Sequence, residues 1–190
     1  MHLSRDECEL FYNLYPTLLC FVNKKLNISK ERFENVEDCQ SIHPETLMAI
    51  RDALFAHREL IDEFVKENPA QLSADALKIV ASWKHAVVGK FYIFRYLTDY
   101  TVFLTLGDPP HKAFGVLGLD NPLKGIFGPG LPKPVSAVLL PFKDKIVCDG
   151  LVAGQNINFD SDIKKMLNED YKKAQEAFGI ITSLPIEGEK

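Results

Sequence analysis

The amino-acid sequence predicts an α+β protein: a helical N-terminal part packed on a five-stranded antiparallel meander or small SH3-like barrel, with a C-terminal helix. Up to residue 86 the apolar residues recur with the 3.6-residue period of helices. From 87 to 159 the chain is rich in β-branched and aromatic residues and is interrupted by turn signals, which is typical of strands. We therefore predict one compact unit with four parts: a helical part at 1–86, a sheet or small barrel at 87–159, a helix at 160–179 and a tail at 180–190.

The first predicted helix covers residues 4–26. Ser4 and Glu7 form a capping box, in which the serine hydroxyl accepts a hydrogen bond from the third helical amide and the glutamate reaches back to the serine amide. Pro16 lies inside this helix and lacks a backbone N–H, so we expect it to kink the helix or to split it in two. The polar segment 27–43 is predicted to be a connecting loop.

Two further helices are predicted before the strands begin. Pro44 suits the first position of the second helix, whose apolar residues keep the helical period to about Lys66 before an Asn-Pro pair stops it. Ser73 then caps a third helix that extends as far as Trp83 or His85.

Five consecutive short strands are predicted in the second half of the chain, and they are expected to pair as an antiparallel meander. Their residues are 87–97, 100–106, 113–119, 135–142 and 145–152. Polar corners at 98–99 and 143–145 join the first two and the last two strands, and a loop rich in glycine and proline spans 120–134.

The first of these strands is apolar on both of its faces. Strict alternation places one set of side chains on one face and a second set on the other: Phe91, Ile93 and Leu97, then Tyr92, Phe94 and Tyr96. A sheet with two apolar faces is either curled into a small barrel or covered by helices, so we expect the predicted helices to cover this one.

The C-terminal helix begins at Asp160 or Ser161, either of which can cap it, and Gly179 is a natural stop. The end of the tail, LPIEGEK at 184–190, is expected to be frayed.

Two stretches, NPAQLSADALKIVASWKHAVVGKFYIFRYLTDYTVFL at 68–104 and AVLLPFKDKIVCDGL at 137–151, resemble a family of uncharacterised bacterial proteins of unknown function. The resemblance covers about the last two-thirds of the chain and consists of apolar strands and turns. It implies a bacterial, cytoplasmic protein in which helices precede strands, and it transfers no functional residues.

Composition restricts the classes of function. The formal net charge is −4, which argues against a dedicated nucleic-acid binder because phosphate contacts need clustered lysine and arginine. No apolar run approaches the roughly 18 residues of a membrane helix, and the N-terminus has no apolar signal core. The four cysteines include no C-x-x-C pair and nothing else suggests secretion, so we expect free thiols in a cytoplasmic protein. Because no apolar run is long enough to cross a membrane, we expect no membrane partner.

Common catalytic signatures are missing from the sequence. It contains no phosphate-binding loop, no dinucleotide fingerprint, no G-x-S-x-G elbow, and no cysteine and histidine cluster with zinc spacing. We therefore predict neither a metal site nor a cofactor.

Four polar side chains are the candidate catalytic residues: Asp108, His111, His85 and Asp99. The sequence Asp-Pro-Pro-His at 108–111 follows a strand, so its aspartate and histidine could reach a common metal or act together in acid–base catalysis. The structural alternative is a stiff turn whose prolines fix the backbone. His85 has an alternative role as well, because a histidine at a helix end can bond a terminal carbonyl.

Two other residues are interpreted as structural. His57 lies in a helix without an acid four residues later, so it suits a surface position better than a metal site. Cys148 and Asp149 point to opposite faces of a regular strand, so they cannot act jointly, and Cys148 is expected to be a core residue.

Aromatic and basic residues of the first two strands are the candidate binding residues: Tyr92, Arg95, Tyr96 and Tyr100. Such a stripe can stack bases on a sheet surface or can simply form the core of a small barrel.

Three functions follow from these observations. The leading hypothesis is a non-enzymatic binding or interaction module whose partner is a protein or peptide. The alternative is a hydrolase-type enzyme with a site near Asp108 and His111, which requires at least two of the candidate catalytic side chains to converge in one pocket. The third is nucleic-acid binding through the aromatic strands, which predicts a salt-sensitive gel shift.

Overall fold

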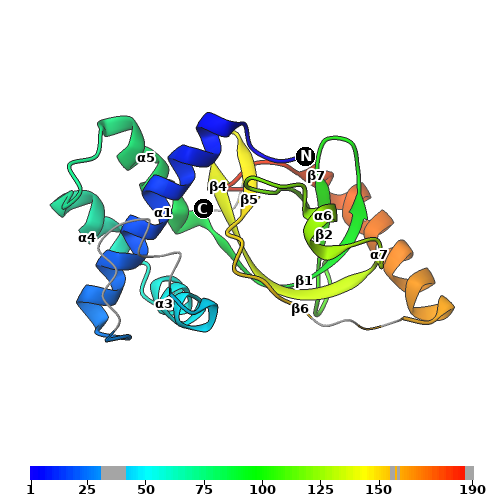
Figure 1. Ribbon diagram of the computed structural model, residues 1–190. Coiled ribbons are helices and arrows are strands. Elements are labelled where there is room, and N and C mark those ends of the chain that lie inside the picture. The colour runs from blue at the N-terminus through cyan, green and yellow to red at the C-terminus, as the bar shows by residue number, and fades with distance from the viewer. Residues whose placement is uncertain (31–41, 155–156, 158, 187–190) are drawn as a thin grey trace. The chain divides into compact units, whose positions relative to one another are not determined.

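The computed structural model of the chain describes residues 1–30, 42–154, 157 and 159–186 (Figure 1). The chain divides into two compact units: a helical unit, Ser4–Lys84, and a β unit that combines Met1–Leu3 with His85–Lys190. Each unit has its own apolar interior. The predicted packing of the helical part on the sheet stays a prediction.

Four α-helices form the described part of the helical unit: α1 (Arg5–Leu26), α3 (Pro44–Ala56), α4 (Glu59–Glu67) and α5 (Ala74–Ser82). The predicted capping box is present, because Ser4 Oγ accepts a hydrogen bond from the Glu7 amide and the Glu7 carboxylate accepts one from the Ser4 amide. Ser73 caps α5 through the amide of Ala76, also as predicted. Of the predicted loop 27–43, residues 31–41 lie outside the described residues.

Helix α1 is a single element, so Pro16 does not split it. The proline lies near the middle of the helix, and the helix continues on both sides of it for two turns or more. Nearby, the hydroxyl of Thr17 donates to the carbonyl oxygen of Asn13 at 2.7 Å. The long apolar face of α1, which buries residues from Cys8 to Asn23, stabilises the helix despite the missing amide.

The prediction of a single helix from Pro44 to Lys66 is wrong, because the helix is interrupted at His57. That residue leaves the helical region with φ −126° and ψ 61°, and α4 begins at Glu59. Apolar residues keep the same period on both sides of the break, so the pattern gave no sign of it. The predicted end is confirmed: Asn68 adopts a left-handed conformation with φ 42° and donates its amide to the Phe64 carbonyl.

Trp83 is the centre of the helical unit. It is fully buried, and its ring lies 5.9 Å from that of Phe11 and 5.3 Å from that of Tyr15, both in edge-to-face contact. At the surface, Lys25 of α1 bonds Glu67 and Glu63 of α4, and these hydrogen bonds raise the pKa of the lysine.

The described β unit contains seven strands and two α-helices. The strands are β1 (Val87–Tyr96), β2 (Thr101–Thr105), β3 (Ala113–Leu117), β4 (Lys133–Phe142), β5 (Lys145–Cys148), β6 (Ala153–Gly154) and β7 (Ile180–Ile181). The helices are α6 (Leu123–Phe127) and α7 (Ser161–Phe178). One prediction is corrected, because the loop at 120–134 contains α6. In the tail 180–190, β7 pairs with β3 ahead of the residues expected to be frayed.

The sheet is mixed, so the prediction of a purely antiparallel meander is wrong. Its strand order is β1-β2-β3-β5-β4-β6, and β1 also pairs with β4 over Val87–Ile93. The pair β3–β5 is parallel, with Val116 opposite Ile146, and the pair β3–β7 is parallel as well. The chain can reach this parallel pairing because the long connection through α6 and β4 lies between β3 and β5.

A β-bulge in β1 changes which side chains face the interior. The register with β2 shifts between Ile93 and Arg95. Phe91 and Ile93 lie in the interior cluster, as does Tyr96, whereas Phe94 belongs to the opposite face. Tyr96 is therefore on the interior side, and the strict alternation expected for this strand is wrong beyond Ile93.

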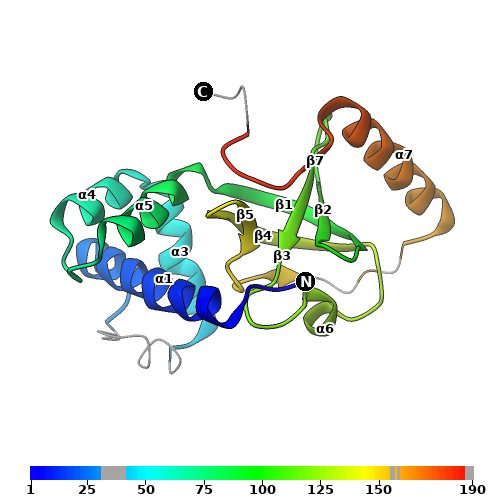
Figure 2. The same cartoon turned by 90° about the horizontal axis from the view of Figure 1, so that it is seen from above.

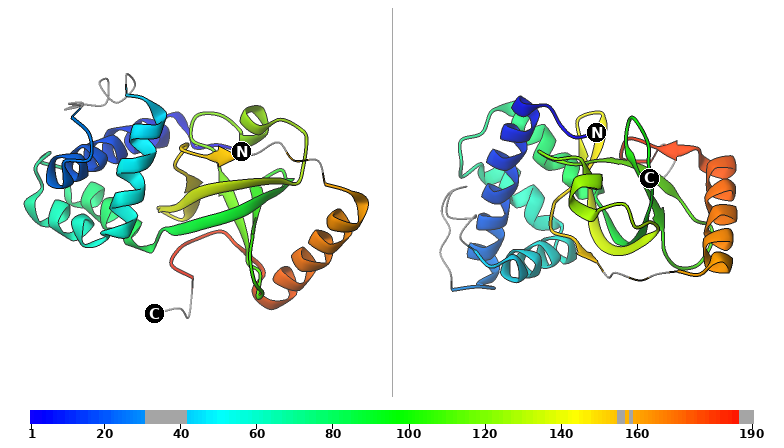
Figure 3. Two further views of the ribbon diagram at one scale, coloured as in Figure 1. Left: turned by 90° about the horizontal axis from the view of Figure 1, so that it is seen from below. Right: turned by 45° about the vertical axis from the view of Figure 1, so that its right-hand side comes forward.

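Two apolar clusters hold the β unit together. The interior cluster lies among β1, β2, β3, β4 and β5, with Phe91 in edge-to-face contact with Phe103 and Phe114. The second lies on the outer face of β1, β2 and β3, where α7 covers it with Leu167, Tyr171 and Ala174. Figures 2 and 3 show α7 alongside this face of the strands. Asp160 caps α7 and Gly179 ends it, as predicted.

The hairpin β4–β5 agrees with the sequence prediction. The two strands are antiparallel, and Lys143 turns the corner with a left-handed φ of 57°. Cys148 is a buried residue of the interior cluster, as expected. Asp149 is buried too, and its carboxylate accepts the amide of Leu151 at 3.1 Å, so it stabilises the turn after β5.

Gly115 provides a test of strand packing. A Cβ added there would lie 2.9 Å from Cγ of Tyr100 and 3.1 Å from Cγ2 of Thr182. We expect Gly115→Ala to lower the free energy of unfolding by about 1–3 kcal/mol, because the tyrosine ring and β3 must move apart. The matched control is Gly125→Ala in α6, where an added Cβ has no neighbour within 4 Å and alanine favours the helix. Chemical denaturation of both variants measures the effect, and equal stability of the two would contradict the close packing.

Candidate functional site

The four candidate catalytic side chains lie apart from one another. His85 is exposed at the end of the 3₁₀ turn Trp83–His85, and Asp99 is exposed in the turn between β1 and β2. Asp108 is exposed in the loop between β2 and β3, where His111 is half-buried. Within the described part of the chain, no hydrogen bond or ion pair joins any two of the four. A hydrolase site needs at least two of these side chains in one pocket, and this arrangement does not support such a site.

His111 connects the β2–β3 loop to α7. Its Nδ1 lies 3.1 Å from the carbonyl oxygen of Thr105, and its Nε2 lies 3.7 Å from Oδ2 of Asp170 on α7. A cavity of about 220 Å³ lies beside the pair, lined mainly by proline, alanine and phenylalanine, with Lys173 at its edge. The ring therefore lies between the β2–β3 loop and α7, and both His111 and Asp170 line this cavity. Sequence reasoning missed Asp170, because no local pattern connects it to the loop.

Arg95 is engaged by α7. Its guanidinium lies 5.1 Å from the ring centre of Phe94 and 4.9 Å from that of Tyr171. It also donates a hydrogen bond to Oδ1 of Asn168 at 2.6 Å. This arginine therefore fastens the helix to the sheet, although it was a candidate for ligand binding.

Two of the candidate tyrosines are also used by the fold. Tyr96 lies against the interior cluster and donates its hydroxyl to the carbonyl oxygen of Gly128 at 2.8 Å. Tyr100 packs its ring against the backbone of Gly115. Only Tyr92 of the four candidates lines an open groove. A continuous aromatic platform for stacked bases is therefore not formed by these residues.

Two tyrosines of the β unit, Tyr96 and Tyr171, should make the stability of the protein depend on pH. Burial raises the pKa of Tyr96 and of Tyr171; at Tyr171 the charge of Arg95 partly opposes this effect. A raised folded-state pKa means that the folded protein holds the phenolic proton more tightly than the unfolded chain. This stabilisation is fully present below the ordinary tyrosine pKa of about 10 and is lost as the pH rises through the folded-state values.

We expect Tyr171→Phe to lose less stability than the wild type when the pH is raised above about 10. Urea denaturation across this range measures the change, with Tyr12→Phe in the helical unit as the control. Identical pH profiles for the wild type and Tyr171→Phe would contradict the assignment.

A groove on the outer face of β1 and β4 is a feature that could receive a ligand. Its volume is about 560 Å³. Two neighbouring strands supply its floor, since Lys90 pairs with Ser136 and Tyr92 with Pro134. The described residues that line it are Lys90, Tyr92, Leu106, Pro134, Val135, Ser136, Ala153, Gly154, Ile157 and Phe159.

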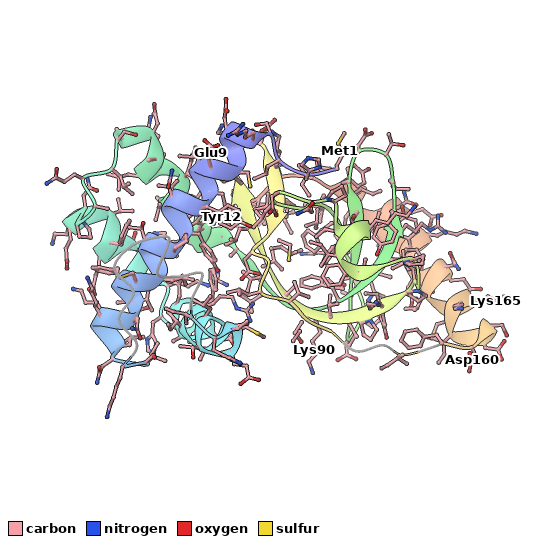
Figure 4. The ribbon with its side chains drawn as sticks, in the orientation of Figure 1. Met1, Glu9, Tyr12, Lys90, Asp160 and Lys165 are labelled. Atoms are coloured by element: carbon pink, nitrogen blue, oxygen red, sulfur yellow. The ribbon has the colours of Figure 1, made fainter. Side chains whose placement is uncertain are left out.

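The walls of this groove are apolar and partly fixed. Phe159 contacts Tyr92 edge to face, with ring centres 5.7 Å apart. Ile157 is 44% exposed although it is apolar. Among the described lining residues Lys90 is the only charged one, and Figure 4 shows it pointing away from the strands. An apolar groove of this size with few polar groups is typical of a binding site.

Metal chemistry has no candidate in the described part of the chain, where no three histidine, cysteine, aspartate or glutamate residues gather closely enough to hold an ion. Cys39 lies outside the described residues. Across the described helices, none is both long and apolar enough to cross a membrane.

The comparisons with known proteins gave no match. No family model, no curated protein and no solved structure matches the chain.

Proposed function

We propose that this protein is a non-enzymatic binding module that receives a protein or peptide segment in the groove between β1, β4 and β6. The observation that carries the proposal is the groove itself: about 560 Å³, apolar walls, and two polar side chains, Lys90 and Ser136, in its floor. Covering such exposed apolar surface with a partner lowers the free energy of the complex, because apolar area is removed from water.

The strand connectivity supports a scaffold suited to binding. We infer that the ring of pairings β1-β2-β3-β5-β4-β1 is a small barrel. This order, with β3 parallel to β5 and a helix between β3 and β4, favours the oligonucleotide- and oligosaccharide-binding barrel over the SH3-like barrel. The argument is an analogy of fold and assigns no ligand by itself.

The position of α7 favours the groove over the usual binding face of such a barrel. That face is formed by the second and third strands. Here Val102, Leu104 and Ala113 of β2 and β3 pack against α7. Of the groove lining on β1 and β4, Tyr92 packs against this cluster, whereas Lys90, Pro134 and Ser136 are not part of it.

The engagement of the candidate residues within the fold and the low positive charge of the groove weaken the nucleic-acid hypothesis. Of the candidate residues, Arg95, Tyr96 and Tyr100 are engaged within the fold, and the described lining of the groove has a single cation. A chain with net charge −4 and one lysine in its groove gives little attraction to phosphate. No gel shift with single-stranded DNA at low salt would remove this hypothesis. The bacterial, cytoplasmic setting belongs to the proposal as well.

A selection experiment tests the proposed function. A displayed library of random peptides is panned on the full chain and, in parallel, on the full chain carrying Ser136→Trp, which fills the groove. We expect peptides that are enriched on the wild type only and that bind it with one-to-one stoichiometry in calorimetry. Enrichment of the same peptides on both proteins, or on neither, would overturn the proposal.

A further inference from the structure

The cavity between the β2–β3 loop and α7 brings two polar side chains together inside apolar walls. Its volume is about 220 Å³, below the roughly 300 Å³ at which pockets for drug-sized ligands begin, so it suits a smaller molecule. His111 comes from the loop and Asp170 from the helix, and their side chains are 14% and 19% exposed. Both are therefore largely withdrawn from water while they line the cavity.

The hydrogen bond at Nδ1 of His111 sets the role of the other ring nitrogen. Nδ1 lies 3.1 Å from the carbonyl oxygen of Thr105. A carbonyl oxygen can only accept, so Nδ1 carries the proton, and Nε2 of the neutral ring is then an acceptor. Nε2 lies 3.7 Å from Oδ2 of Asp170, and a carboxylate is an acceptor as well. Two acceptors therefore face each other across the cavity wall.

The carboxylate of Asp170 lacks a donor among the described residues. It receives no hydrogen bond from that part of the chain, and its distance to Nε2 of His111 is too long for one. Leaving a largely buried carboxylate without a donor costs free energy, so a group that donates to both acceptors is bound favourably. A primary ammonium offers several N–H donors and a positive charge, and it matches this pair better than a neutral hydroxyl does.

The remaining lining restricts the rest of the ligand. Lys173 follows Asp170 by three residues, on the same side of α7, and is exposed at the edge of the cavity. Across the described chain no ion pair involves Lys173, so a ligand carboxylate beside it is attracted and a bare cation is repelled. The other lining residues are apolar: Pro109, Pro110, Ala174, Ala177 and Phe178.

We propose that this cavity binds a free α-amino acid with an apolar side chain. The ammonium group lies between Nε2 of His111 and the carboxylate of Asp170, the ligand carboxylate lies at Lys173, and the apolar side chain lies against the walls. The inference goes beyond the proposed function, because the described linings of the cavity and of the groove share no residue.

Calorimetry of the full chain with L-leucine tests the proposal. We expect saturable one-to-one binding with a Kd of about 1 mM or below. N-acetyl-leucine has no ammonium group and should bind at least about tenfold more weakly. The amine 3-methylbutylamine has no carboxylate and should bind about threefold more weakly, since the pair with an exposed lysine contributes less. Absence of saturation up to about 10 mM leucine, or equal binding of leucine and either analogue, would overturn the proposal.

Asp170→Asn keeps the shape of the side chain and removes its charge. We expect it to weaken leucine binding at least about tenfold. Asp162→Asn is the matched control, because it makes the same change at an exposed position of α7 outside the cavity lining. Nitrogen-15 NMR of the His111 ring gives a readout without ligand, in which Nδ1 is protonated and Nε2 is not at neutral pH. Equal weakening by both variants, or a ring protonated on both nitrogens, would contradict the assignment.

Filling the cavity tests the site without changing its polar groups. Ala177→Trp is expected to abolish leucine binding, whereas Gln175→Trp, at an exposed position of α7 outside the lining, should bind as the wild type does. Ser136→Trp, which fills the groove, should also leave leucine binding unchanged. Loss of leucine binding in Ser136→Trp with retention in Ala177→Trp would place the amino acid in the groove and overturn this inference, while the proposed function would stand.

Discussion

Replacing Phe91 with alanine is expected to lower the free energy of unfolding of the β unit by about 3–5 kcal/mol, the usual cost of removing a buried phenylalanine. The side chain is 1% exposed and lies in the interior cluster. Its ring contacts those of Phe103 and Phe114 at centre distances of 6.0 and 6.1 Å, so truncation removes two aromatic contacts and leaves a cavity.

Native-state hydrogen exchange of the slowest amides in β2 and β3 measures this loss. The single tryptophan, Trp83, belongs to the helical unit, so its fluorescence follows that unit separately. Leu97→Ala is the control, because Leu97 is 41% exposed and a surface truncation costs about 0.5 kcal/mol or less. A loss below about 1 kcal/mol for Phe91→Ala would show that the interior is not packed as described.

Ser136→Trp is expected to raise the Kd of a selected peptide about thirtyfold, which corresponds to about 2 kcal/mol, the size of a binding hot spot. Ser136 lies between Lys90 of β1 and Ala153 of β6, so an indole there occupies the floor of the groove. The fold should tolerate the change because this side chain lines the groove and is outside the interior cluster.

Calorimetry with the purified variants measures the change in Kd. The control is Ser183→Trp, which adds the same side chain at an exposed position outside the groove lining. We expect this control to bind as the wild type does. Equal weakening by both tryptophans, or by neither, would place the peptide elsewhere on the chain.

The local parts of the fold could be predicted from the sequence because their causes are local. Ser4, Ser73 and Asp160 cap helices through amides within three residues. Ser4 and Ser73 were identified as caps, and Asp160 was one of the two candidates for the last helix. Asn68 and Gly179 end helices through backbone conformations that suit these residues.

The errors come from interactions between distant segments. The parallel pairing of Val116 with Ile146 depends on the path of the whole connection, which alternation along one strand does not encode. The bulge near Ile93 reverses the side-chain phase of β1, and the turn chemistry around it gives no warning. The break at His57 interrupts a helix whose apolar period continues unchanged.

The candidate site was predictable only in part for the same reason. Tyr92 was identified because aromatic residues are dense in β1. Ser136 and Ile157 were not, since they are ordinary residues that become neighbours of Tyr92 only when β4 and the segment before α7 meet β1. Asp170 reaches His111 from the last helix in a comparable way.

The most direct test of the central claim is methyl NMR of the full chain during titration with a selected peptide. Ile157 and Leu106 report on the groove, and the exposed side chains of Ile126 and Met166 report on α6 and α7. We expect the methyl signals of Ile157 and Leu106 to shift with saturation while those of Ile126 and Met166 stay in place. Shifts at Met166 without shifts at Ile157 would contradict the assignment of the groove as the binding site.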